Sequence, residues 1–446
     1  MSAFFLCEKN DMNSNSLVVI GNGMASNRVL EELGKDHPFD AIHVLSDEHL
    51  SHYNRIMLSP LLADETTLDA ITPHDADWYQ QRRITVHLNT PVARIDTRQK
   101  IVVAGNNEPF SYHALLIATG SRSAIPAMPG TDNGTLPDNV LGFRTMSDVD
   151  AMLAALPTLK HATVIGAGLL GVEAAVGLKA QGVDVTLMHR NPILMNRQLD
   201  ATASGILQRE LEQRGIDVRT GVSPQGLDLT GNSATAVQYR LRSEPAEAAV
   251  KTLNTDLVVF ATGILPNREL ASAAGIDTQR GICVNERMEA SAEDVYSLGE
   301  CCEFEGLTYG LVAPIWEQAK VVAAGLLSIN DPSGKSQLSG YAEQEHLTKL
   351  KVSGVDIHSM GQFEPSDNDQ IIQLQDLKSG IYKKLVIREQ QVVGVLCVGD
   401  VLDSSWYFDL LSHNADISAI RTNLIFGKGY CEDDTSKAGT QEDNAA

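Results

Sequence analysis

The fold is decided by the stretch Ala162-Thr163-Val164-Ile165-Gly166-Ala167-Gly168-Leu169-Leu170-Gly171. In it, an apolar run leads directly into glycines at the spacing G-x-G-x-x-G. This pattern is typical of a buried parallel strand, a tight turn and the first turn of a helix. Backbone N–H groups at such a helix start can bind a pyrophosphate. The stretch therefore predicts a dinucleotide-binding βαβ unit at Gly166, Gly168 and Gly171.

A related loop lies closer to the N-terminus. The apolar run 17–20 leads into Gly21-Asn22-Gly23, and Ser26 fills the place of the third glycine. Each loop is followed by Ala-Thr-Gly at nearly the same distance, since Ala118 lies 97 positions after Gly21 and Ala261 lies 95 positions after Gly166. Two matched loops indicate two related domains that bind two dinucleotides. A flavin beside a nicotinamide is the economical interpretation.

The alternation of strands and helices predicts an α/β protein with two Rossmann-like domains, one inserted in the other, of the three-layer ββα type. A smaller α+β domain is expected to follow them. The predicted parts are an FAD-binding domain at 16–125 and 253–330, an NAD(P)H-binding domain at 126–252, a C-terminal domain at 341–428, and a disordered acidic tail at 429–446.

Charged side chains near the first loop suggest how it would hold FAD. Asp47 or Glu48 can accept hydrogen bonds from a ribose diol, or form a solvated acidic turn. Arg55 can lie near the flavin or its pyrophosphate, or stabilise its own loop. Glu300 can bind a ribitol hydroxyl, or simply end a strand. The candidate FAD residues are Gly21, Gly23, Ser26, Asp47, Glu48, Arg55, Ala118, Thr119, Gly120, Gly299 and Glu300.

The second loop carries the candidate NAD(P)H residues. Glu173 can hydrogen-bond the nicotinamide amide, or complement the helix dipole. Enzymes that use NAD place an acid at the end of the second strand, whereas this chain has His189 and Arg190 there. Arg190 can pair with a 2′-phosphate, which favours NADPH or dual use, or can be a solvated charge. The candidate NAD(P)H residues are Gly166, Gly168, Gly171, Glu173, His189, Arg190 and Gly263. No side chain is expected to act as a catalytic acid or base.

The composition argues against several classes of protein. With 35 Lys and Arg against 57 Asp and Glu, the net charge is −22, which disfavours nucleic acid and anionic membranes as partners. No apolar run approaches the roughly 20 residues of a membrane span, and no secretory signal is expected at the N-terminus. The six cysteines and the histidines have no metal-ligand spacing, so no metal is predicted. We expect a cytoplasmic protein with reduced thiols.

Several motifs, one of which includes the first loop, carry a resemblance to a known family. They are Val19–Ala25, Tyr53–Ser59, Leu194–Asp200, Ala261–Asn267, Leu298–Cys301, Tyr309–Ala319, Tyr382–Leu385 and Trp406–Leu411. On these residues the chain resembles the pyridine nucleotide–disulfide oxidoreductase family over residues 16–428. The likeness is strongest to the FAD/NAD(P)H module of bacterial assimilatory NAD(P)H-nitrite reductase large subunits and to nitrate reductase electron-transfer subunits.

The resemblance implies that NAD(P)H bound at the Gly166 loop delivers a hydride to FAD. No cysteine lies between Cys7 and Cys283, so the family's C-x4-C pair is missing and disulfide reduction is not expected. The sequence also lacks the iron–sulfur and sirohaem segments of full nitrite reductases. The expected role is therefore electron donation to a separate protein of nitrate or nitrite assimilation. The alternatives are a rubredoxin or ferredoxin reductase and a flavin-based redox sensor without turnover; a homodimer is also considered.

Overall fold

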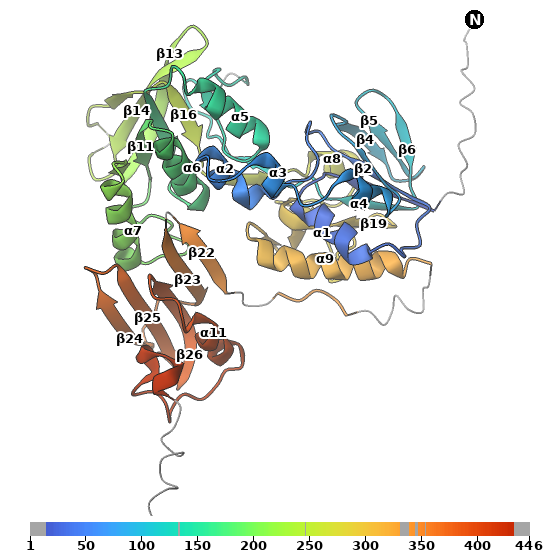
Figure 1. Ribbon diagram of the computed structural model, residues 1–446. Coiled ribbons are helices and arrows are strands. Elements are labelled where there is room, and N and C mark those ends of the chain that lie inside the picture. The colour runs from blue at the N-terminus through green and yellow to red at the C-terminus, as the bar shows by residue number, and fades with distance from the viewer. Residues whose placement is uncertain are drawn as a thin grey trace, which may run out of the picture. The chain divides into compact units, whose positions relative to one another are not determined.

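The computed structural model describes residues 15–132, 134–245, 247–330, 339–343, 347–352 and 354–431 (Figure 1). The chain divides into two compact units. Residues up to 124, 144–151 and 263–344 form the first unit, and residues 125–143, 152–262 and 345 onward form the second. The predicted tail lies outside the described residues from position 432 onward.

The first unit is built on a parallel sheet with the strand order β19-β7-β1-β2-β3. Its strands are β1 (Ser16–Ile20), β2 (Ala41–Leu45), β3 (Ile84–His87), β7 (Ala114–Ile117) and β19 (Val295–Ser297). Ile20 aligns with both Leu45 and Ile117, so neighbouring strands end at the same edge of the sheet. This edge is where ligands bind in open α/β sheets.

Helices cover one face of this sheet, and a small antiparallel sheet covers the other. Because side chains alternate along a strand, Leu17 and Val19 pack with the helices, whereas Val18 and Ile20 pack with the small sheet. The helical layer contains α1 (Met24–Leu33) and α9 (Val312–Leu327), and the small sheet contains β4 (Val92–Asp96), β5 (Ile101–Ala104) and β6 (Pro109–Ser111). This is the predicted ββα layering.

Short elements complete the first unit. They are η1 (Arg55–Met57), α2 (Leu58–Leu62), α3 (Leu68–Ile71), α4 (Ala76–Gln80), β8 (Ser121–Ser123), β17 (Ile264–Pro266), α8 (Glu269–Ala273), β18 (Ile282–Cys283), η2 (Gly299–Cys301), β20 (Cys302–Phe304) and β21 (Leu307–Thr308). Among them, β8 and β17 pair antiparallel where the chain leaves the first unit and returns to it.

The second unit holds a sheet of the same design, with the order β12-β11-β10-β16-β9. Its strands are β9 (Val140–Leu141), β10 (His161–Ile165), β11 (Asp184–Met188), β12 (Asp217–Arg219) and β16 (Leu257–Phe260). Its other elements are α6 (Leu169–Ala180), α7 (Ala201–Gln213), β13 (Val222–Thr230), β14 (Ser233–Leu241) and β15 (Lys251–Asn254). Helix α5 (Met146–Ala155) is divided, because its residues up to 151 belong to the first unit and the rest to the second. Val237 and Tyr239 of β14 share a core with Ile165 of β10, which gives the second ββα layering.

Two predicted assignments differ from the structure. Residues 144–151, predicted for the NAD(P)H-binding domain, belong to the first unit. The FAD-binding domain was expected to resume at residue 253, but β16 pairs in parallel with β10, and the chain rejoins the first unit at Gly263. The physical reason is that 257–260 is a fully buried apolar run. Such a run fits the middle of either sheet, and its composition does not say which.

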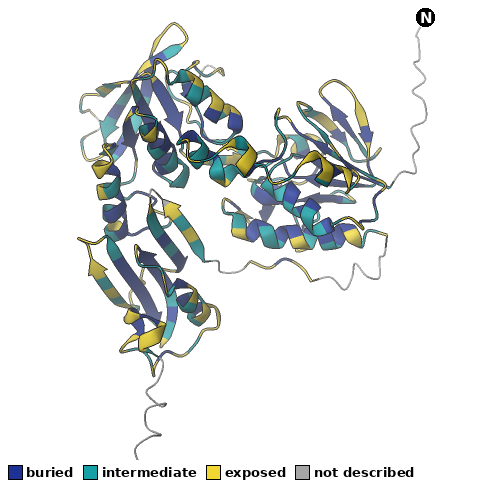
Figure 2. Cartoon of the chain, viewed as in Figure 1, coloured by how far each residue is buried: buried dark blue, intermediate teal, exposed yellow. Residues whose placement is uncertain are grey.

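The C-terminal part of the second unit is an antiparallel sheet with the order β22-β23-β26-β25-β24. Its elements are β22 (Thr348–Val352), β23 (Val355–Gly361), β24 (Gln370–Asp376), β25 (Ile381–Arg388), β26 (Gln391–Val398), α11 (Ser404–Ser412), η3 (Leu424–Phe426) and η4 (Lys428–Tyr430). Helix α11 packs on β26, and the edge strand β24 is largely exposed (Figure 2). Two parallel-sheet units followed by an antiparallel sheet confirm the predicted α/β fold class.

Candidate functional site

The first glycine loop turns sharply at the end of β1. Gly21 has φ +102°, and a Cβ atom there would lie 2.3 Å from the carbonyl oxygen of Ala118. Only glycine fits this close approach. The Ala-Thr-Gly segment at Ala118 therefore packs directly against the first glycine loop. By contrast, no atom lies within 4 Å of the place where a Cβ of Gly23 or Gly120 would stand. The loop therefore leaves open space beside its backbone.

Both glycine loops end in helices whose N-termini lack a protein acceptor. Gly23 caps α1 and Gly168 caps α6 without any side-chain hydrogen bond, and neither helix has an acid in its first turn. The cap of α7, Asp200, accepts a hydrogen bond from Ala203 N at 3.0 Å. The first N–H groups of α1 and α6 thus keep the positive dipole end available to an anion, which fits a pyrophosphate.

A network of polar side chains supports the backbone of the first loop. The Asn27 side chain donates to Asn22 Oδ1 (2.9 Å) and to the Gly23 carbonyl (3.0 Å), and Tyr79 donates to Asn27 Oδ1 (3.2 Å). His52 hydrogen-bonds the backbone of Asn22, and burial, followed by the nearby His74, lowers the pKa of His52 to about 4. Asn22 Nδ2 is buried with no partner among the described residues, so it can donate to a ligand.

Ser26 occupies the third glycine position of the first loop without a clash. Its hydroxyl donates to the Gly23 carbonyl at 3.0 Å, and the residue is fully buried. In the second loop, a Cβ at Gly171 would lie 1.8 Å from the Gly166 carbonyl oxygen. The helix therefore approaches the turn more closely in the second loop, and only that loop needs the third glycine.

The predicted residues Glu48 and Arg55 form an ion pair in the structure. Glu48 also accepts a 2.7 Å hydrogen bond from the Tyr53 hydroxyl, and Arg55 lies over the Tyr53 ring at 5.0 Å. Arg55 also donates to the Arg144 carbonyl at 2.9 Å. Its contacts with Glu48 and Tyr53 hold its own loop, and a position near the flavin remains a prediction. Asp47 is exposed.

Glu300 is held by two residues that the sequence did not single out. It pairs with Arg144 and accepts a 2.9 Å hydrogen bond from the Ser121 hydroxyl. Arg144 Nε donates to the Ser121 carbonyl at 2.8 Å, and burial lowers the Arg144 pKa to about 10. Glu300, Glu48 and Arg55 are thus linked through Arg144 at the end of the first sheet. No local motif marks Arg144 or Ser121, because their partners are distant in sequence.

The Ala-Thr-Gly of the first unit is fixed by a residue of the second Ala-Thr-Gly segment. The Thr119 hydroxyl donates to the Asn267 carbonyl at 2.8 Å, and Asn267 Nδ2 donates to the Thr119 carbonyl at 2.9 Å. Gly263, predicted for the NAD(P)H site, accepts a hydrogen bond from Ala124 N within the first unit. Its contacts are therefore with the β8–β17 pair, which leaves its predicted coenzyme role untested.

The second loop repeats the geometry of the first. Gly166 has φ +108°, and a Cβ there would lie 2.3 Å from the Ala261 carbonyl oxygen. At the end of β11, His189 Nδ1 accepts a 3.0 Å hydrogen bond from Ala167 N, and burial lowers the His189 pKa. Arg190 is exposed. His189 Nδ1 is therefore used by the loop itself, and a contact between Arg190 and a 2′-phosphate remains a prediction.

Glu173 lies beyond the first turn of α6 and is half-buried. A charge at this depth gains little from the helix dipole, whose effect falls off within the first turn. The dipole interpretation is therefore weaker than the sequence suggested. The nicotinamide interpretation remains a prediction.

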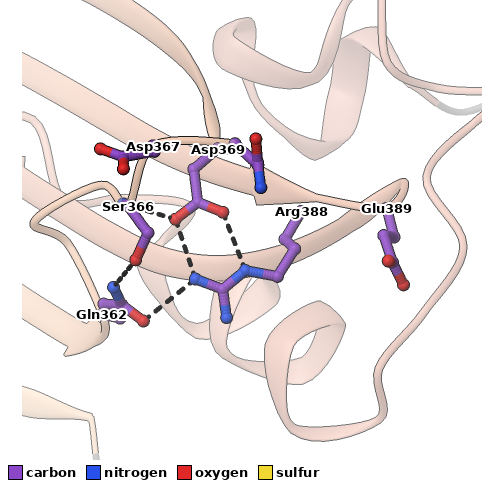
Figure 3. Close-up of a pocket in the computed structure, with 7 residues that line it drawn as sticks. Gln362, Ser366, Asp367, Asp369, Arg388 and Glu389 are labelled. Atoms are coloured by element: carbon purple, nitrogen blue, oxygen red, sulfur yellow. Dashed lines mark hydrogen bonds and ion pairs between the residues drawn. The ribbon is translucent and has the colours of Figure 1, made fainter.

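A separate hollow of about 490 Å³ lies on the C-terminal sheet (Figure 3). Its Arg388 donates to both carboxylate oxygens of Asp369 at 2.8 Å and to Gln362 Oε1 at 3.1 Å. The charges of Arg388 and Asp369 are therefore paired with each other, and this hollow gives no support for a cofactor site. Among the described residues, no group of three or more His, Cys, Asp or Glu side chains could hold a metal, and no helix is long and apolar enough to cross a membrane.

Comparison with known proteins gives the family. Residues 15–324 match the pyridine nucleotide-disulphide oxidoreductase family, and residues 347–415 match the rubredoxin NAD+ reductase C-terminal domain. This chain belongs to the pyridine nucleotide-disulphide oxidoreductase family. The resemblance inferred from the sequence motifs is confirmed. The cofactors of this family are FAD and NADH or NADPH, and the two uncapped loops fit them.

Two Bacillus subtilis proteins are similar over most of the chain. The nitrite reductase [NAD(P)H] is 40% identical over 91% of this chain and 48% of its own length, and the assimilatory nitrate reductase electron transfer subunit is 37% identical over 93% and 51%. The chain thus spans about half the length of these curated relatives. The crystal structure of NADH:rubredoxin oxidoreductase from Clostridium acetobutylicum shares the fold, with a TM-score of 0.72, 23% identity, and coverage of 91% of this chain and 97% of that one.

Proposed function

We propose that this chain is an FAD-dependent NAD(P)H oxidoreductase that passes electrons to a separate protein. The observation that carries the proposal is the pair of glycine loops, each closed against an Ala-Thr-Gly carbonyl and each opening onto a helix start without a protein cap. One such loop would support a single nucleotide. Two of them, in a chain of this family, support FAD at the Gly21 loop and NAD(P)H at the Gly166 loop.

The protein's part in the reaction is binding and orientation. When bound, FAD would supply hydride acceptance and the release of electrons one at a time. The N–H groups of α1 and α6 would hold the pyrophosphates, and Asn22 Nδ2 would add a donor at the first loop. Glu300 and Arg144 keep fixed charges at the end of the first sheet. No nucleophile is needed, so the buried Cys301 and Cys302 are packing thiols.

We propose nitrate or nitrite assimilation as the setting. The similarity to a nitrite reductase and to a nitrate reductase electron transfer subunit supports it, over about half of each relative. The acceptor would be the reductase component of that system. A cytoplasmic location and a homodimer stay predictions from the sequence.

A rubredoxin or ferredoxin reductase is the second candidate. The match of residues 347–415 to the rubredoxin NAD+ reductase C-terminal domain favours it. The net charge of −22 disfavours this candidate, because rubredoxins and ferredoxins are usually acidic and would be repelled. A redox sensor without turnover is the third candidate.

Ferricyanide reduction by the FAD-loaded protein with NADH or NADPH separates an enzyme from a sensor. Rapid turnover is expected, whereas flavin reduction without turnover would favour the sensor. Comparison of a nitrite reductase component with rubredoxin as acceptor then separates the two enzyme candidates. Faster reduction of rubredoxin would contradict the assimilation proposal.

A further inference from the structure

Two adjacent lysines of β25 are buried and point to opposite faces of the C-terminal sheet. Lys383 is 4% exposed and pairs at 2.7 Å with Asp400, which belongs to the same C-terminal part of the chain. Lys384 is 6% exposed and donates to Asp200 Oδ2 at 3.0 Å. Asp200 lies in the NAD(P)H-type part of the second unit, so Lys384 links that part to the C-terminal sheet.

Asp200 accepts three hydrogen bonds. The Tyr382 hydroxyl donates to Oδ2 at 2.8 Å, beside Lys384, while Oδ1 accepts from Ala203 N and caps α7. Asp200 is 7% exposed and Tyr382 is 2% exposed. A buried carboxylate with a cation and two further donors is held in one position, because any movement would leave a charge unpaired.

The segment before Asp200 runs back to the coenzyme loop. Leu194 N donates to Ser204 Oγ on α7 at 2.8 Å, and Met195 N donates to the Ala167 carbonyl at 2.8 Å. Met195 is 1% exposed and has φ +46°, a conformation that a non-glycine residue keeps only when its surroundings enforce it. Ala167 is the second residue of the Gly166–Gly171 loop.

We propose that Asp200 and Lys384 are positioning residues for the NAD(P)H loop. The path is continuous: Lys384 and Tyr382 fix Asp200, Asp200 fixes the start of α7, and α7 fixes the 194–199 segment that bonds the Ala167 carbonyl. Through this path the C-terminal sheet acts on coenzyme binding. The inference rests on the proposed NAD(P)H site at the Gly166 loop.

The test uses Lys384→Met with Lys383→Met as a matched control. Both variants remove one buried lysine from β25 and leave one acid without its cation, but only Lys384 is linked to α7. We expect Lys384→Met to raise the KM for NAD(P)H, and the calorimetric Kd for NAD+ or NADP+, about fivefold. FAD content and kcat with ferricyanide should be retained. Lys383→Met should leave both coenzyme constants unchanged.

If Lys384→Met does not fold, the Asp200→Asn, Lys384→Met double variant decides. It carries no unpaired buried charge, and asparagine still caps α7. A raised KM in the double variant supports the proposal, and an unchanged KM overturns it. Equal effects of Lys384→Met and Lys383→Met would also overturn it. If the unaltered protein binds neither NAD+ nor NADP+, the proposed function fails as well; if it binds and Lys384→Met binds equally, only the positioning role fails.

Discussion

At the scale of single residues, Gly21 holds a position that no other residue can take without moving Ala118. We predict that Gly21→Ala strongly lowers FAD content and the free energy of unfolding. The reason is a Cβ placed 2.3 Å from the Ala118 carbonyl oxygen, in addition to the positive φ. Gly34→Ala is the control, because its φ is +69° but nothing lies within 4 Å of its Cβ. The ψ of Gly34 is −154°, which is also a glycine conformation, so Gly34→Ala should lose stability from backbone strain but keep its FAD content. An equal loss of FAD in both variants would contradict the close approach.

His52 gives a pH dependence at the same scale. Burial and the nearby His74 lower its pKa from 6.5 to about 4, so the unfolded chain takes up the proton first as the pH falls. The free energy of unfolding should therefore decrease between pH 6.5 and 4, by up to about 3 kcal/mol from this residue. Measured by urea unfolding across this pH range, the free energy of unfolding should decrease less steeply in His52→Gln than in the unaltered protein. The exposed His49→Gln is the control; the same slope in all three proteins would contradict this.

At the scale of elements, substitutions at the uncapped start of α6 can distinguish effects on stability from effects on coenzyme binding. Gly168 has φ −77° and open space at its Cβ, so Gly168→Asp and Gly168→Asn can both cap the helix. Both should keep or raise the melting temperature. Only the aspartate places a negative charge where the pyrophosphate binds, so Gly168→Asp should raise the KM for NAD(P)H far more than Gly168→Asn. Equal KM values would argue against an anion site at this helix start.

The sequence predicts those elements whose signal is local. An apolar run followed by glycines at fixed spacing specifies β1 with α1 and β10 with α6, because strand, turn and helix start are contiguous. The sequence cannot assign β16 to one of the two parallel sheets, because the composition of a buried strand does not specify which strands pair with it. It also misses Arg144 beside Glu300 and Lys384 beside Asp200. Those pairs form between residues that only the folded chain brings together.

At the scale of the whole molecule, the charge of −22 affects electron acceptors. Ferricyanide is an anion, so repulsion should slow its encounter with the protein at low ionic strength. The kcat/KM for ferricyanide should rise as salt is added, since the Debye length shortens to about 8 Å at physiological ionic strength. A cationic acceptor, hexaammineruthenium(III), should show the opposite trend. The same trend for both acceptors would mean that a local positive surface governs access.

The central claim is that two dinucleotides bind in one chain, FAD at the Gly21 loop and NAD(P)H at the Gly166 loop. Its most direct test is anaerobic addition of NADH or NADPH to protein loaded with FAD, followed by absorbance. We predict one FAD per chain and loss of the yellow absorbance on addition of the coenzyme. Gly168→Asp should keep the FAD but respond only at much higher coenzyme concentration. Protein that stays colourless after incubation with FAD, or that stays yellow with both coenzymes, would contradict the account.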